Sequence, residues 1–251
     1  MRKWRKVLIL LALIVFIAGL AVLLYPCFQG VMTDQRITQE AHEFLEWADT
    51  VPTLPLDNSK PEPTETTPIL YPDLLSAIQE YNARIWEEKQ TGLCDPWAYQ
   101  QPSFTLSEYG LEDEVFGVLT IPKLGLEMPI YLGATSQHMA DGAAHLSQTS
   151  IPIGGMNANC VIAGHRGWQG ASYFRYITDL EIGDEVIVTN LWEALTYRVC
   201  ETKIIAPNDV DEILIQENRD LLTLLTCHPY ASGGKQRYVV YCERMYEMEV
   251  R

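Results

Sequence analysis

The sequence predicts a mainly β protein, with short strands forming a closed barrel or a sandwich, preceded by a transmembrane helix and a helical and extended stalk. From Val115 onward, short apolar runs rich in β-branched residues are separated by Gly, Pro and Asn, which is typical of both β architectures. Residues 7–25 form an apolar run without a charge, long enough to cross a bilayer as a helix. The 251 residues therefore divide into a basic tip with a signal anchor (1–30), a stalk (31–110) and one compact β domain (111–251).

The apolar run is expected to be a retained anchor rather than a cleaved signal peptide. The last residue of the run, Tyr25, and the three that follow it, Pro26, Cys27 and Phe28, provide no small-residue cleavage site. Four cations precede the run, and the positive-inside rule places that end in the cytoplasm; they are Arg2, Lys3, Arg5 and Lys6. We therefore expect a single-pass protein of the cell membrane, with its N-terminus in the cytoplasm and its β domain outside the cell.

The charge of the exported part excludes one class of partner. The whole chain has a formal net charge of −15, and without the four cations of the tip it keeps 14 Lys and Arg against 33 acidic residues, a balance of −19. Such a chain repels phosphate backbones. No nucleic acid is therefore expected as a partner, whereas the membrane is.

The stalk is expected to contain two amphipathic helices and a spacer. Residues 33–50 place apolar side chains near helical spacing, with Thr33 as N-cap. Residues 51–68 are rich in Pro and polar residues and predict an extended spacer. Pro72 suits the first turn of a second helix. One face of that helix should pack on the β domain, and it presents Leu74, Leu75, Ile78, Tyr81 and Ile85.

The β domain contains eight runs that we expect to form strands. A short helical segment is expected before the Gly-Asp turn, within residues 173–186. The expected strands are residues 115–121, 126–132, 159–165, 184–190, 194–200, 202–206, 220–227 and 237–244.

The six cysteines predict neither a disulfide framework nor a zinc site, because their spacing is irregular and no CxxC occurs. A pair between Cys200 and Cys242 stays open. Cys160, Cys200 and Cys242 lie within strand patterns, where cysteines are usually packing residues. Cys227 differs because an apolar strand delivers it to the start of the loop HPYASGG, where a partly exposed thiol can react.

A reactive thiol needs an imidazole or a cation beside it. His228 adjoins Cys227, but neighbours along an extended chain point to opposite faces. His165 is better placed, since it follows the buried run CVIAG at a strand-to-loop transition. Arg237 begins the strand after the glycine-rich loop, so a hairpin returns it beside Cys227, where a guanidinium suits a developing oxyanion. Each of the three also has a purely structural interpretation: packing, a backbone hydrogen bond or an edge ion pair.

The run Thr223-Leu224-Leu225-Thr226-Cys227 resembles the TLxTC signature of sortases, the membrane-anchored cysteine transpeptidases of Gram-positive bacterial surfaces. The resemblance covers about Glu114 to Glu243 and continues in VFGVLTIPKLGLEMPIYLGAT, AAHLSQTSIPIGG, VIAGHRG and RYITDLEIGDEV. It implies a closed sortase-type barrel of about eight strands. It also implies that Cys227 is the nucleophile, His165 the general acid and base, and Arg237 the group that binds the oxyanion.

A second resemblance lies upstream. Cys94-Asp95-Pro96-Trp97 is similar to the Asp-Pro-aromatic lid of class C, or pilin-type, sortases. This similarity implies an inhibitory lid of Asp95, Pro96 and Trp97, in which the carboxylate meets Arg237 and the indole covers Cys227. The alternative is an ordinary turn that ends a linker. Two departures weaken the class assignment: Ala231 replaces a usual glycine and delays the arginine by one residue, and the second membrane span of many class C members is missing.

The resemblance implies cleavage of an LPxTG-like sorting signal between Thr and Gly on a secreted surface or pilin protein, followed by transfer to an amine. The acceptor is expected to be a pilin lysine, as in pilus assembly. The alternatives are a housekeeping-type sortase that anchors proteins to a cell-wall precursor peptide, a hydrolytic cysteine peptidase, and a binding module without activity. None of the expected steps demands a metal or an organic cofactor.

Overall fold

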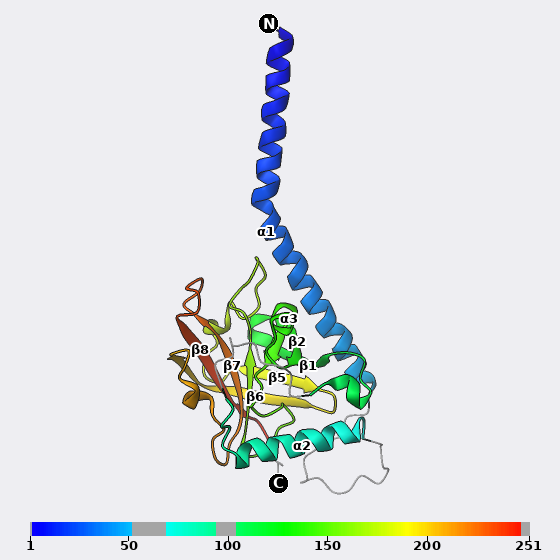
Figure 1. Cartoon of the computed structure of the whole chain (residues 1–251), viewed down its shortest axis with the longest axis vertical. Helices are drawn as coiled ribbons and strands as arrows, with labels where there is room; N and C mark the ends of the chain where they lie inside the picture. Colours follow the sequence, from blue (N-terminus) through cyan, green and yellow to red (C-terminus); the bar gives the residue numbers. More distant parts are fainter. Residues whose placement is uncertain (1, 52–68, 94–103, 247–251) are drawn as a thin grey trace.

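The structure is a computed structural model that describes residues 2–51, 69–93 and 104–246 (Figure 1). Its centre is a closed barrel in the order β1-β2-β3-β4-β7-β8-β6-β5. Neighbouring strands are antiparallel except in the pairs β2–β3 and β4–β7, which are parallel. The predicted barrel is therefore confirmed and the sandwich is excluded. The strands are β1 (Val115–Ile121), β2 (Leu126–Leu132), β3 (Ala143–His145), β4 (Ala158–Ala163), β5 (Glu185–Asn190), β6 (Ala194–Ile205), β7 (Asp220–His228) and β8 (Gln236–Arg244).

Two expected strands are in fact one, and one strand was missed. The expected strands 194–200 and 202–206 are parts of the single strand β6, which ends at Ile205 and whose ladder with β8 shifts register between Val199 and Glu201. The missed strand is β3, only three residues long. It contains no β-branched residue and is defined by its pairing with β2 and β4, so its sequence has no strand pattern.

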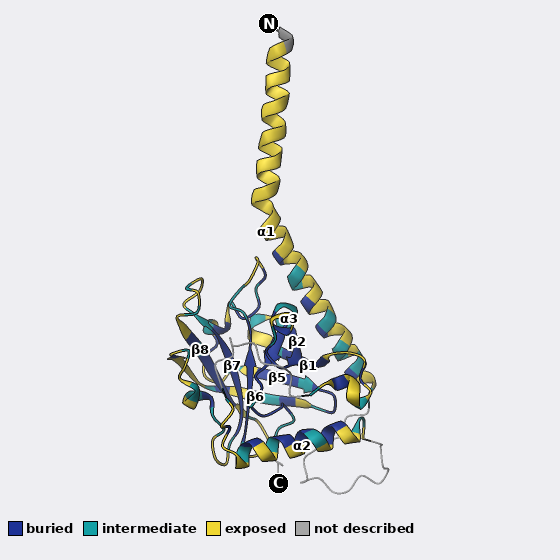
Figure 2. Cartoon of the chain, in the orientation of Figure 1, coloured by how far each residue is buried: buried dark blue, intermediate teal, exposed yellow. Residues whose placement is uncertain are grey.

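The barrel interior is filled by apolar side chains from every strand. Much of the strand ribbon is accordingly coloured as buried in Figure 2. β4 is buried along its whole length and β7 up to Thr226, because both strands have neighbours on each side and cover on each face. The short helices lie in the connections. They are α3 (Ser136–Asp141) and the 3₁₀ turns Leu106–Tyr109, Pro122–Leu124, Ile177–Asp179 and Val210–Ile213.

The first helix, α1 (Arg2–Thr50), is continuous, whereas the sequence predicted an anchor and a separate helix capped by Thr33. That expectation was wrong: Thr33 lies inside α1. Pro26 also lies inside α1, and a proline in a helix removes one hydrogen bond and bends the axis. Figure 1 shows α1 changing direction about halfway along its length.

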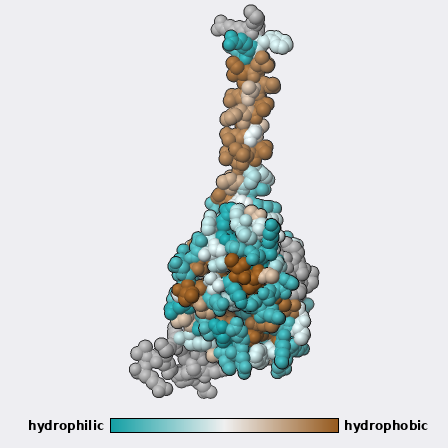
Figure 3. Space-filling view, turned by 90° about the vertical axis from the view of Figure 1, so that its left-hand side faces the viewer, coloured by the Kyte–Doolittle hydropathy of each residue, from teal (hydrophilic) through white to brown (hydrophobic). Residues whose placement is uncertain are grey.

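The two halves of α1 have different environments. The first half is exposed and apolar (Figures 2 and 3) and is long and apolar enough to cross a membrane. The second half lies against β2 and β1, with Ile37 in the barrel core. The Tyr131 hydroxyl donates a hydrogen bond of 2.6 Å to Glu40. One helix thus forms both the anchor and part of the domain surface.

Helix α2 (Pro72–Glu87) covers the end of the molecule farthest from the N-terminus (Figure 1). Pro72 occupies its first turn and the five predicted apolar residues are all buried, so this prediction is confirmed. They pack in a second cluster with Phe116 and Trp192. The Trp192 indole donates to the Leu70 carbonyl at 2.6 Å, which joins the start of α2 to the barrel.

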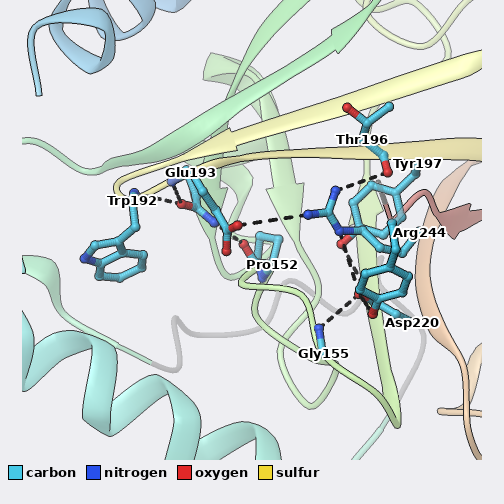
Figure 4. A network of polar contacts seen from close by, with 10 residues as sticks. Pro152, Gly155, Trp192, Glu193, Thr196, Tyr197, Asp220 and Arg244 are labelled. Atoms are coloured by element: carbon cyan, nitrogen blue, oxygen red, sulfur yellow. Dashed lines mark hydrogen bonds and ion pairs between the residues drawn. The ribbon is translucent and has the colours of Figure 1, made fainter. Parts of the chain in front are cut away.

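A polar network closes the barrel at the start of β7 (Figure 4). The buried Asp220 carboxylate accepts hydrogen bonds from the Gly155 N–H and the Tyr246 hydroxyl, both at 3.0 Å. Arg244 lies 4.0 Å from Asp220 and donates to the Thr196 carbonyl at 3.2 Å. The network joins β7, β8 and β6 at the end of β7 opposite Cys227.

Candidate functional site

Cys227 and Arg237 are direct cross-strand partners. β7 and β8 are antiparallel, and Cys227 is opposite Arg237 in their register. The loop between the two strands folds back over this pair: a methyl group added at Gly234 would lie 3.1 Å from both the Cys227 Sγ and the Arg237 Nη1. The sulfur and the guanidinium therefore both lie close to Gly234.

The guanidinium of Arg237 is held in place by the same loop. Its side chain is buried, with an exposed fraction of 4%. Nη1 donates hydrogen bonds to the carbonyls of Gly234 at 2.7 Å and Gln236 at 3.2 Å. A buried, always-charged fork beside a thiol is suited to stabilise negative charge on a substrate oxygen.

The position of His165 relative to Cys227 follows from the parallel pairing of β4 with β7. Ala163 is the register partner of Leu225, so His165 and Cys227 each lie two residues beyond a paired position. The ladder continues past β4, because the Gly164 N–H donates to the Leu225 carbonyl at 3.1 Å and the Thr226 hydroxyl donates to the Gly164 carbonyl at 2.7 Å. Equivalent positions on parallel neighbours are adjacent, so the register brings the backbones of His165 and Cys227 to the same end of the barrel.

The imidazole of His165 is enclosed by two aromatic rings. Trp168 stacks on it with ring centroids 5.2 Å apart, and Tyr173 meets it edge-on at 5.7 Å. Burial by these neighbours lowers the pKa of His165 below its ordinary value of 6.5. The imidazolium is therefore a stronger acid than usual and the minor form near neutral pH.

Arg166 is a site residue that the sequence analysis missed. Its Nη1 bonds the His228 Nδ1 at 2.6 Å and lies 3.4 Å from the Cys227 carbonyl, and its Nη2 donates to the Thr178 hydroxyl at 3.2 Å. It therefore joins the loop after His165 to the backbone of Cys227. The sequence feature that could have identified Arg166 is its position directly after His165. His228 is turned toward Arg166, in keeping with the expectation that it does not pair with the thiol.

Three other cysteines and one other histidine have structural environments: Cys160, Cys200, Cys242 and His145. Cys200 and Cys242 are free thiols, so the structure shows no disulfide between them. Burial raises the pKa of the thiols of Cys160 and Cys242, which makes them poor nucleophiles. His145 bonds the carbonyls of Thr149 and Ser150. Asp95, Pro96 and Trp97, the expected lid, lie outside the described residues.

The family model for the sortase domain matches residues 119–245. Among curated proteins, Sortase D of Bacillus subtilis (strain 168) is 31% identical over 131 residues, which are 51% of this chain and 63% of that protein. The chain thus matches less than two thirds of the length of that relative.

Solved structures of sortases C are similar over a larger part of the chain. Sortase C1 of GBS pilus island 1 aligns with a TM-score of 0.68 at 25% identity, covering 86% of this chain and 95% of that one. Sortase C-1 of Actinomyces oris aligns with a TM-score of 0.62 at 29% identity, covering 70% and 99%. The eight-stranded barrel, the register that pairs Cys227 with Arg237, and the match to the family model over residues 119–245 lead to one conclusion: the chain belongs to the sortase family.

Proposed function

We propose that the chain is a membrane-anchored cysteine transpeptidase that cleaves an LPxTG-like sorting signal between Thr and Gly and transfers the acyl group to an amine, a pilin lysine. The observation that carries this proposal is the register of three strands: Arg237 on β8 is the partner of Cys227 on β7, and β4, which ends two residues before His165, is the parallel neighbour of β7. The similarity to sortases C supports the pilin-type assignment. The substrate motif and the acceptor rest on the sequence resemblance.

In the first half of the reaction, the Cys227 thiolate attacks the Thr carbonyl carbon. The carbon–sulfur bond forms, and the oxygen that becomes negative is held by the Arg237 guanidinium. The carbon–nitrogen bond then breaks, and protonated His165 donates its proton to the leaving glycine amine. Because burial lowers the pKa of His165, its imidazolium gives up this proton more readily than an exposed one would.

In the second half, the substrate is held as a thioester on Cys227. The amine of the acceptor attacks the same carbonyl carbon, neutral His165 takes the proton that the amine loses, and Cys227 leaves as a thiolate. One amide bond is broken and one is formed, so the reaction needs no external energy. Thioesters react readily with amines, which favours transfer over hydrolysis.

The proposed location is the cell membrane, with the N-terminus in the cytoplasm and the barrel outside. The apolar half of α1 fits a single-pass anchor. The four cations that precede it support this orientation through the positive-inside rule.

The proposal is tested with the full chain in detergent, a quenched LPxTG peptide and an amine acceptor. Cys227→Ala should lower kcat/KM by at least about a thousandfold, since it removes the nucleophile. Arg237→Lys keeps the charge but loses the fork and should lower kcat/KM about a hundredfold. Cys200→Ala is the matched control: Cys200 is a half-buried thiol on β6 whose contacts are Arg219 and the Tyr241 carbonyl, and its loss should leave the rate unchanged.

Product analysis separates the rival activities. Mass spectrometry should find the peptide joined to the amine. Free acid alone would identify a hydrolytic peptidase, and a preference for a cell-wall precursor amine over a lysine side chain would identify an anchoring sortase. Cleavage by Cys227→Ala at the parental rate would refute the proposal.

A further inference from the structure

We propose that α1 is part of the active site: its Gly30–Asp34 segment holds the loop that follows His165 and thereby positions the imidazole. This inference rests on the proposed role of His165 as general acid and base. It makes the membrane anchor a working part of the enzyme and not only a tether, and it assigns Asp34 as a positioning residue.

The first contact is between two backbones. A methyl group added at Gly30 would lie 2.8 Å from the Gly170 Cα and would overlap the Gly170 carbonyl group. In the same way, a side chain on Gly170 would overlap the Pro26 carbonyl oxygen. The helix and the loop can approach this closely only because both positions are glycine. Figure 1 shows the loop between β4 and β5 rising from the barrel to α1 at this level.

The second contact is a pair of hydrogen bonds one turn further along α1. The Ser172 N–H donates to the Asp34 Oδ1 at 2.8 Å, and the Ser172 hydroxyl donates to the Asp34 Oδ2 at 3.1 Å. Hydrogen bonds to a carboxylate are stronger than neutral ones. Asp34 therefore fixes the backbone of the loop, not only a side chain at its surface.

From Ser172 the contacts lead directly to the imidazole. The Trp168 N–H donates to the Ala171 carbonyl at 3.2 Å and the Ala171 N–H to the Trp168 carbonyl at 2.9 Å, so the segment held by α1 also holds Trp168. Tyr173, the residue after Ser172, is buried in the barrel core together with Ile37 of α1. Trp168 and Tyr173 are the two rings that enclose His165.

The loop needs support from outside because its backbone is strained. Gln169 and Tyr173 have φ angles of 48° and 42°, in the left-handed region that residues with a side chain rarely adopt. Such a conformation is unfavourable and persists where its surroundings hold it. With α1 displaced, the loop should relax, Trp168 and Tyr173 should move away, and His165 should lose both its position and its burial.

The test compares alanine at two glycines of the same helix, in the full chain. Gly30→Ala should push α1 away from Gly170 and lower kcat/KM about tenfold to a hundredfold, the scale expected for a displacement of about 1 Å at a catalytic group. Gly19→Ala is the matched control, because a methyl group there meets nothing within 4 Å, and it should leave the rate unchanged. Both changes favour the helix equally, so a lower helix propensity cannot explain a difference.

The pH profile distinguishes positioning from a general loss of folded protein. In Gly30→Ala, His165 should be less buried and should therefore have a higher pKa. The limb of the kcat/KM profile that reports the titration of His165 should then move to higher pH. A smaller folded fraction would lower the whole profile without moving that limb.

Asp34 provides an independent pair of variants. Asp34→Ala removes both acceptors and should reproduce the lower rate and the shifted limb, whereas Asp34→Asn keeps an acceptor for the Ser172 N–H and should restore most of the rate. His42→Ala, which removes an exposed contact between α1 and Glu127, should have no effect. Parental rates and profiles in both Gly30→Ala and Asp34→Ala, with Cys227→Ala inactive, would overturn this inference and leave the proposed function standing.

Discussion

At the scale of single residues, burial decides what each histidine can do. His165 and His145 both have lowered pKa values because both are desolvated. His165 is only partly buried, with an intermediate exposure. His145 is fully buried and its Nε2 donates to two backbone carbonyls, so its neutral form is part of the fold.

His145 makes the stability of the chain sensitive to acid. Burial lowers its pKa to about 4 from 6.5. The unfolded chain therefore takes up a proton below pH 6.5 that the folded chain refuses until about pH 4, so stability is present at neutral pH and is lost as the pH falls through this window. Between pH 7 and pH 5 the free energy of unfolding should fall by about 2 kcal/mol from this group.

Urea unfolding of the parent and of His145→Gln at the two pH values measures this effect. Glutamine has a donor where Nε2 lies but does not titrate, so the variant should be less stable at pH 7 and should lack this part of the pH dependence. An equal fall in parent and variant would mean that other groups cause it.

At the scale of elements, the seam between β1 and β5 closes the barrel at Gly117. This residue is the register partner of Asn190, and a methyl group added to it would lie 2.5 Å from the Thr189 carbonyl oxygen and 3.2 Å from the Asn190 Cα. These are backbone atoms, so the strands themselves must separate to accept a side chain.

Gly117→Ala should therefore lower the free energy of unfolding by about 1–3 kcal/mol, as overpacking does elsewhere. Thr120→Ala is a suitable control, because it lies in the same ladder and its side chain is only half-buried. Chemical unfolding of both variants checks the prediction. If Gly117→Ala lowers the free energy of unfolding no more than Thr120→Ala does, then β1 and β5 can accommodate the added methyl group without strain.

The elements also show which parts of the fold follow from sequence pattern. The apolar face of α2 was predicted residue by residue, because helical spacing is a local signal. The strand β3 could not be predicted: the residues Ala143–His145 are strand only because β2 and β4 flank them. The continuity of α1 was also missed, because Pro26 and the change from apolar to amphipathic residues both indicate a boundary that the helix in fact crosses.

At the scale of the whole molecule, the same limit applies to the site. Cys227, His165 and Arg237 were predicted from strand ends and family motifs. Their residue types indicate a nucleophile, a general acid and base, and a group that binds an oxyanion. The parts played by Gly30, Asp34 and Arg166 depend on contacts between segments far apart in sequence, such as that between Asp34 and Ser172, which are 138 positions apart. No local pattern contains that information.

The orientation of the whole chain is open to a direct test. In protoplasts, whose cell wall has been removed and whose membrane is intact, added protease should digest the β domain while a tag at the N-terminus stays protected. Replacing the four cations before the apolar run by glutamine should increase the fraction of inverted molecules. The same replacement of Lys203 and Lys235, on the barrel, should not, and a protected β domain in the parent would contradict the proposed location.

The parallel pairing of β4 and β7 has one more consequence. The backbones that carry the sulfur and the imidazole are joined by the ladder of these two strands, and the chain between them makes a long excursion through β5 and β6. Insertions and deletions in the parts of that excursion beyond the loop that follows His165 can therefore accumulate during evolution, or be introduced by engineering, without disturbing this ladder. A family built on this arrangement is free to vary its substrate preference while its chemistry stays constant.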